Sequence, residues 1–281
     1  MLFSIGCVTR IVGIMAAVGS AILVPTSLKA ENGSIGALYD VSIAGFGFAR
    51  ASLSLVVNEN RYSATISTQP AGVGTLVTAG KGTAKASGYL NGKTVLPSRY
   101  NMNSSSDNKR SYVKMKVGEG RLKTLNVAPK LRPFKDRIAV TAKHHSDIVD
   151  PVSAILMPLE NSSASFGPQA CDRRIPIFDG WTRYDIQLSY KRRKKVRGFG
   201  YDGDVIICSA RWVPVAGHRP AKKSVQYMAA NTDMEIWLAP LAGTRVLFPY
   251  RASMRTAAGK LIVLARKINM SAAPSRVQAA K

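Results

Sequence analysis

The sequence has few acidic residues and few of the side chains that bind metals. It holds 16 Asp and Glu against 40 Lys and Arg, so its formal net charge is +24. With only 3 His and 3 Cys and no CxxC spacing, it carries no recognisable metal motif and no catalytic thiol pattern. A cationic excess of this size predicts attraction to phosphate-bearing partners, which are anionic lipid head groups, lipopolysaccharide or nucleic acid.

Long hydrophobic runs are also scarce, and the single one lies at the start of the chain. Arg10 precedes an apolar run over 11–24, Pro25 ends it, and 27–30 (SLKA) places a small residue before Glu31. A basic residue, an apolar core of roughly 7–15 residues and a small residue at the cut are typical of a secretory signal peptide. An uncleaved anchor helix is the alternative, but the apolar core is shorter than the roughly 20 residues of a membrane span.

The signal peptide is predicted over residues 1–30, a single β-rich domain over 31–269, and a disordered tail over 270–281. Cleavage removes Arg10 and Lys29 and no acid, which lowers the formal net charge from +24 to +22. Export predicts a periplasmic location and argues against nucleic acid as a partner. Since no second apolar run approaches a membrane span, we expect the exported part to be peripheral to a membrane at most.

Cysteine is scarce after the leader, because only Cys171 and Cys208 remain. Two cysteines in an exported chain predict one disulfide. The bridge would close a loop of about 37 residues, which the chain-entropy treatment values at about 4 kcal/mol. The alternatives are a metal pair or a catalytic thiol, but His144, His145 and His218 lie away from both cysteines in the sequence.

Alternation of apolar and polar residues runs through most of the chain. Over 39–43, for example, Tyr, Val and Ile alternate with Asp and Ser, as in a strand with one wet face. Strands of that kind belong to antiparallel sheets. The same pattern predicts further strands over 52–57, 62–66, 85–90, 95–101, 110–117, 120–127, 184–190, 205–213, 234–238, 245–250 and 260–267.

Helical patterns are few and short, at 71–79, 150–157 and 221–230. In the second of these, Asp150 can cap the first turn and Pro151 suits the first helical position. About a dozen strands with one apolar face must curl or split to bury that face. We therefore predict an all-β, mainly antiparallel fold: a large curled sheet or open β-barrel, with two or three short helices beside it.

Several segments resemble one known family. They are Cys171–Gly180 with Arg183-Tyr184-Asp185, Pro214–Pro220, Trp237–Arg245, and the stretch from Tyr39 through Leu96-Pro97 and Tyr100 to Asp150-Pro151. This pattern resembles domain-of-unknown-function family 3108 over nearly the whole exported chain. The resemblance implies an exported protein of Gram-negative bacteria, of alphaproteobacterial type, and it implies no reaction. A more distant likeness to periplasmic lipoprotein carriers concerns architecture alone.

A basic run forms the densest charge cluster of the sequence. It consists of Lys191, Arg192, Arg193, Lys194, Lys195 and Arg197. Because it lies between two strand patterns and precedes Gly198 and Gly200, we predict that it occupies a hairpin loop. It would bind phosphates of anionic lipid or lipopolysaccharide. The alternative is a solvated loop that only keeps the protein soluble.

Catalytic and metal-binding patterns are weak. Asp172, Asp179, Asp185, Asp202 and Asp204 gather around the predicted disulfide, but their spacing does not fit a calcium loop. We expect Asp172 and Asp179 to bond to backbone or to neighbouring arginines. Adjacent His144 and His145 would face opposite sides of a strand, and His218 is expected in a turn. No triad, GxSxG elbow or phosphate loop is present, so we predict no catalytic residue, metal or cofactor.

Two functions are compatible with this pattern. In the first, a non-enzymatic periplasmic protein supports the cell envelope by binding or carrying a lipidic or lipoprotein ligand in an apolar β-cavity. That cavity would be lined by Tyr39, Val41, Leu53, Leu55, Tyr62, Ile66, Tyr184, Ile186 and Trp212. In the second, a structural or interaction protein with a packed core docks on an anionic envelope partner through its basic surface. An unfilled cavity separates the two, because a packed core leaves no voids much larger than water. A hydrolase built on the Asp residues is a third hypothesis, which requires carboxylates that converge in a pocket.

Overall fold

A computed structural model describes residues 32–106, 109–160 and 166–272. The predicted signal peptide lies outside these residues, as do positions 273–281 of the predicted tail. The described chain forms one large antiparallel sheet of 14 strands that is not closed. This confirms the predicted fold class. No helix in the described ranges has the length and apolar character needed to cross a membrane.

The N-terminal half is an antiparallel meander in which each strand pairs with the next. Its strands are β1 (Asn32–Ile43), β2 (Phe46–Asn58), β3 (Arg61–Pro70), β4 (Lys81–Asn91), β5 (Thr94–Ser106), β6 (Lys109–Gly118) and β7 (Arg121–Ala128). The predicted alternation holds: Leu53, Leu55 and Val57 of β2 are buried, while Ser54 between them is exposed. Tight turns join β1 to β2, β2 to β3, β4 to β5 and β6 to β7. Gly92 and Gly120 take up a positive φ there, which glycine adopts without strain.

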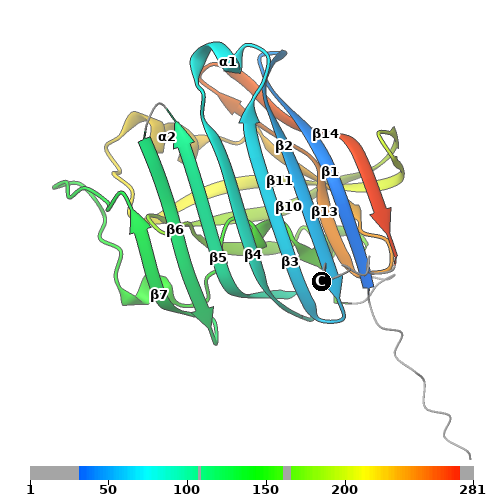
Figure 1. The fold of residues 1–281 in the computed structure, drawn as a ribbon, viewed down its shortest axis with the longest axis horizontal. Coiled ribbons are helices and arrows are strands. Elements are labelled where there is room, and N and C mark those ends of the chain that lie inside the picture. The colour runs from blue at the N-terminus through cyan, green and yellow to red at the C-terminus, as the bar shows by residue number, and fades with distance from the viewer. Residues whose placement is uncertain (1–31, 107–108, 161–165, 273–281) are drawn as a thin grey trace, which may run out of the picture.

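The C-terminal half is a second meander. Its strands are β9 (Arg173–Phe178), β10 (Arg183–Gly198), β11 (Tyr201–Ala216), β12 (Met234–Pro240), β13 (Val246–Thr256) and β14 (Gly259–Ser271), with a short β8 (Met157–Pro158) paired to β13. The first and last strands join the halves, because β1 pairs with β14 from Ile43 opposite Leu261 to Ser34 opposite Ser271. In Figure 1 the strands of the first half lie in front, and β10 and β11 cross behind them.

The sheet has two free edges, β7 and β9, and an inserted segment (residues 146–159) lies between them. Asp147 N donates to Gly120 O beside β7 at 2.6 Å, and Val149 N donates to Pro176 O of β9 at 2.8 Å. Phe178 N donates back to Val149 O at 2.9 Å. The inserted segment thus satisfies backbone groups at both edges, which otherwise would be open to pairing with another chain.

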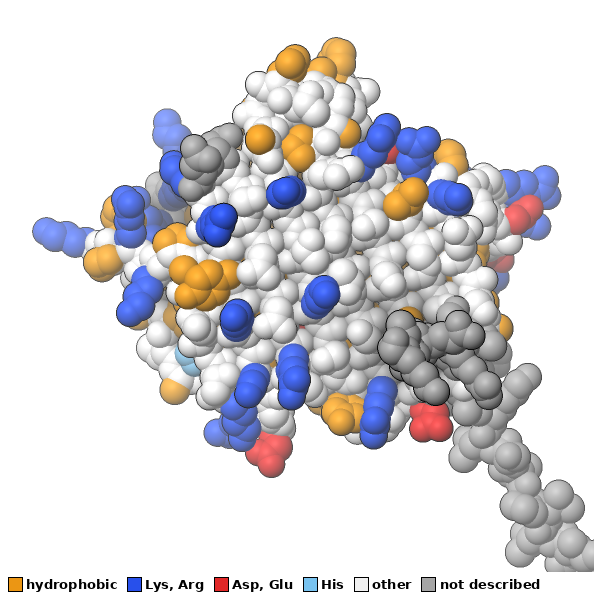
Figure 2. Space-filling model, viewed as in Figure 1, with side chains coloured by type: hydrophobic (Ala, Val, Ile, Leu, Met, Phe, Trp, Pro, Cys, Tyr) orange, Lys and Arg blue, Asp and Glu red, His pale blue; other side chains and the backbone are white. Residues whose placement is uncertain are grey.

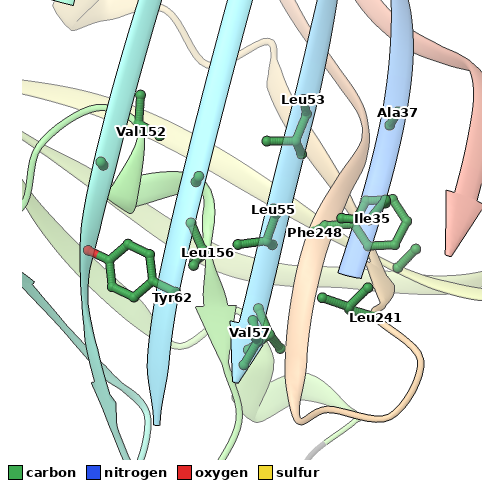
Figure 3. Close-up of a cluster of buried hydrophobic side chains, with 14 of the residues drawn as sticks. Ile35, Ala37, Leu53, Leu55, Val57, Tyr62, Val152, Leu156, Leu241 and Phe248 are labelled. Atoms are coloured by element: carbon green, nitrogen blue, oxygen red, sulfur yellow. The ribbon is translucent and has the colours of Figure 1, made fainter. Parts of the chain in front are cut away.

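The main core lies between the two halves of the sheet. Figure 3 shows Ile35 of β1 and Leu55 of β2 near Phe248 of β13, with Val152 and Leu156 of the inserted segment beside them. Fully burying a side chain such as Leu55 or Phe248 stabilises a fold by roughly 1.5–3 kcal/mol. The inserted segment is therefore part of the core and not a surface loop.

The helices are shorter than the sequence pattern predicted. The pattern over 71–79 yields only α1 (Gly74–Val77), and the one over 150–157 yields a 3₁₀ turn, η2 (Ser153–Ile155), followed by β8. α2 (Lys223–Ala230) agrees with its prediction, and two further 3₁₀ turns, η1 (Ala142–His145) and η3 (Pro168–Ala170), were not predicted. β14 continues past the predicted start of the tail, because Met270 pairs with Ile35 and packs on the core.

Candidate functional site

The most distinctive feature of the interior is an apolar cavity of about 260 Å³ between the inserted segment and strands β9 to β14. All six strands contribute to its wall, as do Pro151, Ala154 and Ile155. Apart from Glu235 and Ser253, the wall consists of apolar and aromatic residues. Its half-buried members include Ile175, Ile186, Ile236, Met254, Leu261 and Val263. Apolar side chains that remain half-buried around a cavity are suited to contact an apolar ligand.

A second, mixed pocket of about 440 Å³ adjoins the apolar cavity. The two share Ala154, Met157 and Ile175, so only these residues and their neighbours separate them. The mixed pocket combines apolar residues with charged ones, which are Lys93, Asp147, Asp172, Arg173 and Arg174. The pair of pockets therefore offers an apolar site next to a polar one.

Two arginines of the mixed pocket have different surroundings. Arg173 donates to three carbonyl oxygens, those of Ala170 at 3.1 Å, Lys93 at 3.2 Å and Pro158. Burial lowers the pKa of Arg173, and these acceptors leave its charge uncancelled. Arg174 instead donates from Nε to Asp185 Oδ2 at 2.6 Å. Arg173 thus ties the inserted segment to β9, while Arg174 is neutralised.

The predicted disulfide is present. Cys171 and Cys208 are bonded, their Cα atoms lie 5.5 Å apart, and both residues are buried. Around them Leu159 packs with Ile206, Leu238 and other apolar residues on the opposite face of β11 from the main core. The bridge fixes the chain that leads from the inserted segment to β9, and so it fixes one wall of the mixed pocket.

A buried polar network underlies the mixed pocket. Asp150 Oδ1 accepts from the N–H groups of Val152 and Ser153, both at 2.9 Å, which agrees with its predicted capping role. Ser153 Oγ donates to Asp150 Oδ2 at 2.5 Å and lies 2.6 Å from the hydroxyl of Tyr62. Burial raises the pKa of Asp150 to about 6. Burial likewise raises the pKa of Tyr62 and of Tyr100. The sequence pattern gave no sign of this network, because Tyr62 comes from the distant strand β3.

The five aspartates that suggested a hydrolase do not converge. Asp179 caps a turn by accepting from the N–H groups of Trp181 and Thr182. This is the role that we expected of Asp179. Asp185, for which we named no partner, accepts from Arg174 and Arg183. Asp202 and Asp204 pair with Arg197 and Arg193 on the β10–β11 hairpin, and Asp172 lines the mixed pocket. The hydrolase hypothesis therefore loses its proposed site.

The histidines are dispersed as well. His144 and His145 lie in η1, where Thr141 and His144 form a capping box that favours a helical turn, so our argument from opposite faces of a strand does not apply to them. His218 follows β11 in a buried bend, with its ring centroid 4.8 Å from that of Trp212, and burial lowers its pKa. Among the described residues, no group of three or more His, Cys, Asp or Glu is placed to hold a metal ion.

The basic run is not a loop, contrary to our prediction. Lys191 to Arg197 belong to β10 and pair with β11, and the turn of the hairpin lies at Phe199 and Gly200. The prediction failed because backbone pairing along a long hairpin continues whether or not the side chains are charged. Gly198 and Gly200, which we predicted to follow the loop, lie at the turn itself.

Half of the basic run is neutralised within the protein. Lys191 lies 2.5 Å from Glu235, and Arg193 and Arg197 pair with Asp204 and Asp202. Lys194 lies over the ring of Trp237, 5.3 Å from its centroid. Arg192 and Lys195 have no ion pair among the described residues. The run is therefore weaker as an anion site than its sequence suggests.

The residues predicted to line an apolar interior divide between two places. Tyr39, Leu53, Leu55 and Tyr62 are fully buried in the packed core. Tyr184 and Ile186 line the apolar cavity. Val41, Ile66 and Trp212 are half-buried. The interior is thus packed along the N-terminal half, whereas the apolar cavity lies beside β9 to β14.

These features define an open, β-barrel-like antiparallel protein whose inserted segment separates an apolar cavity from a mixed pocket. The chain belongs to the family described as protein of unknown function (DUF3108), whose profile matches residues 38–265. This confirms the resemblance found in the sequence.

A solved structure shares the fold. It is the β-barrel-like protein of domain of unknown function DUF1849 from Brucella abortus, with a TM-score of 0.52 and 11% sequence identity. The match covers 85% of this chain and 98% of that one. At this identity the likeness concerns the fold alone. A search of curated proteins found no significant match.

Proposed function

We propose that this protein is a non-enzymatic component of the periplasm that binds an amphipathic lipid. The acyl part occupies the apolar cavity, and the polar head lies in the mixed pocket. The observation that carries the proposal is the apolar cavity itself, with its wall of half-buried aliphatic side chains. Concave sites lined mainly by apolar side chains with a few polar groups are typical of ligand-binding pockets, which supports a ligand here.

The chemistry of the two pockets supports an amphipathic ligand over a purely apolar one. They share Ala154, Met157 and Ile175, so an apolar site and a polar site meet at these residues. The mixed pocket presents the uncancelled cation of Arg173 together with Lys93, and also the carboxylates of Asp147 and Asp172. Such a set can hydrogen-bond to a phosphate or carboxylate head and to its hydroxyl or amine groups.

The periplasmic part of the proposal is supported by two observations. The N-terminal sequence has the pattern of a signal peptide. The Cys171–Cys208 disulfide is of the kind that forms and persists in oxidising compartments such as the bacterial periplasm.

A second candidate function, docking on an anionic envelope partner, is favoured by the outer face of the N-terminal half. Figure 2 shows Lys and Arg scattered over this face with few acids. Arg99 of β5 lies directly opposite Lys116 of β6, and Lys85 and Lys114 both pair with Asn101 between them. Like charges directly opposite one another destabilise a sheet, and an anionic partner would relieve the repulsion.

Filling the cavity tests the first proposal. Ala252→Phe places a ring in the wall of the apolar cavity, whereas Ala84→Phe adds the same ring at a half-buried position of β4 that lines neither pocket. We expect a fluorescent fatty acid to bind the wild type saturably and the Ala252→Phe variant at least about tenfold more weakly, since overpacking costs roughly 1–3 kcal/mol.

The control variant decides what a loss of binding means. Ala84→Phe should keep the affinity of the wild type, and circular dichroism should show both variants folded. Equal binding by all three proteins, or no saturable binding by the wild type, would contradict a ligand in this cavity.

A further inference from the structure

One end of the molecule carries exposed apolar side chains on α1 and on the turn between β1 and β2. Phe46 is 64% exposed, Val73 43%, Leu76 86% and Val77 70%, and we call these four residues the apolar tip. Segments 41–49 and 71–80, which contain them, hold no charged residue. The tip is visible as the hydrophobic side chains at the top of Figure 2.

The apolar tip is fixed to the sheet by its backbone. Ala71 N donates to Phe48 O and Val73 N to Gly47 O, both at 3.0 Å. A Cβ atom at Gly74 would lie 1.8 Å from Phe48 O, so only glycine permits this approach. The loop is thus held against β2 by its backbone, while the side chains of Leu76 and Val77 remain mostly exposed.

The apolar tip and the apolar cavity lie at the same end of the sheet. Leu261, in the cavity wall, is paired with Ile43 at the end of β1. The turn that follows Ile43 leads to Phe46, and within it Ala44 N donates to Lys260 O at 3.0 Å. A surface that contacts the apolar tip therefore lies at the same end of the sheet as Leu261 in the wall of the apolar cavity.

We infer that the apolar tip inserts into the surface of a lipid bilayer that contains anionic lipids. Exposed apolar patches on folded proteins mark membrane or partner sites, and side chains that enter the interface between head groups and acyl chains must be free of charge, as these are. Exposed cations flank the tip at Arg50, Lys81 and Lys260, of which Arg50 pairs with Asp40 and Lys260 with Asp233, while Lys81 has no ion pair among the described residues. The chain as a whole has a formal net charge of +24. The flanking cations and this net charge both favour anionic head groups.

A protein partner is the other class of molecule that an apolar tip can meet. The bilayer fits better because the tip is a small apolar projection and the charged residues that follow its two segments, Arg50 and Lys81, are exposed cations that suit anionic head groups. This inference does not depend on the cavity being occupied.

Vesicle flotation tests the inference. The exported protein is mixed with vesicles of phosphatidylcholine alone or with phosphatidylglycerol added. We expect the wild type to float with the anionic vesicles, and the double variant Leu76→Asp/Val77→Asp to lose at least about tenfold in partition coefficient, which is about 1.4 kcal/mol. Because both side chains are mostly exposed, the thermal midpoint should stay close to that of the wild type.

Two controls locate the effect. Leu131→Asp changes an exposed leucine of another loop and should bind vesicles as the wild type does. Ala252→Phe should also keep vesicle binding, which separates the tip from the cavity. The inference is overturned if the double variant floats as well as the wild type, or if the wild type floats with neither vesicle. Site-specific crosslinking of position 76 to a protein in cells, without flotation, would overturn it in favour of a protein partner.

Discussion

At the scale of single residues, Asp150 joins the inserted segment to the sheet. Its carboxylate caps the turn that begins the segment, and through Ser153 it reaches the hydroxyl of Tyr62 on β3. Buried hydrogen-bonded networks of this kind specify one arrangement of the core, because each partner left unsatisfied is costly. The network therefore holds the shared wall of the two pockets in place.

Asp150 should make stability depend on pH. Because burial raises its pKa from 3.8 to about 6, the folded state binds more protons than the unfolded state between these values. The free energy of unfolding therefore falls as pH rises through this window, by roughly 1.4 kcal/mol for each pKa unit of difference. The nearby hydroxyls of Tyr62 and Tyr100 stay neutral there, since their pKa values are raised.

Asp150→Asn tests this prediction. The amide oxygen can still accept from the two backbone N–H groups, but the side chain no longer titrates. In urea titrations we expect the stability of the variant, relative to that of the wild type, to increase by about 3 kcal/mol from pH 4 to pH 7. A constant difference between the two proteins would show that Asp150 does not carry a raised pKa.

The sequence allowed one side of this network to be predicted and not the other. An Asp followed by Pro and a short apolar run is a local signal, so the capping role of Asp150 could be inferred from neighbours in the chain. The contact with Tyr62 joins residues that are 91 positions apart. Its existence depends on the inserted segment entering the core, for which no local pattern exists.

At the scale of elements, the β10–β11 hairpin differs most from its prediction. A run of six cations within seven residues resembles a solvated loop, yet it forms a regular ladder with β11. Carboxylates at Glu235, Asp204 and Asp202 offset three of the charges, and these partners come from β11 and β12. Cross-strand pairs of this kind stabilise a hairpin and cannot be located before the register is known.

The uneven pairing within β10 gives a prediction about anion binding. Arg192→Gln/Lys195→Gln removes charges without an ion pair in the described structure, and Arg193→Gln/Arg197→Gln removes the same net charge from paired positions. If the strand contributes to binding anionic vesicles, the first variant should bind more weakly and with a shallower salt dependence than the second. Equal effects of the two variants would assign the run to net charge alone.

At the scale of the whole molecule, the strands were predictable and their assembly was not. Alternation located each strand of the meander from β1 to β7, although several strands extend well beyond the predicted ranges, as β1 does by starting at Asn32. The pairing of β1 with β14 and the position of the inserted segment between β7 and β9 depend on contacts across the full length of the chain. β9 escaped prediction because Arg173, Arg174 and Pro176 interrupt its apolar pattern, although every residue from Arg173 to Phe178 pairs with β10.

Lipid binding in the apolar cavity and membrane insertion of the apolar tip concern neighbouring parts of the molecule. The N-terminal half is packed, and the inserted segment lies between the two sheet edges. The apolar cavity beside β9 to β14 includes Leu261, which pairs with Ile43 next to the turn that leads to the apolar tip. An amphipathic lipid taken from a bilayer at the apolar tip would meet an apolar cavity and a polar pocket that adjoin. We therefore expect the apolar cavity to hold such a lipid.

Native mass spectrometry of the protein purified from the periplasm tests that claim most directly. The mass is measured before and after extraction with organic solvent, and the extract is analysed for lipids. The account predicts an added mass that extraction removes, that matches an amphipathic lipid in the extract, and that the Ala252→Phe variant lacks. An identical ligand-free mass before and after extraction, from a protein that also binds no fatty acid, would contradict it.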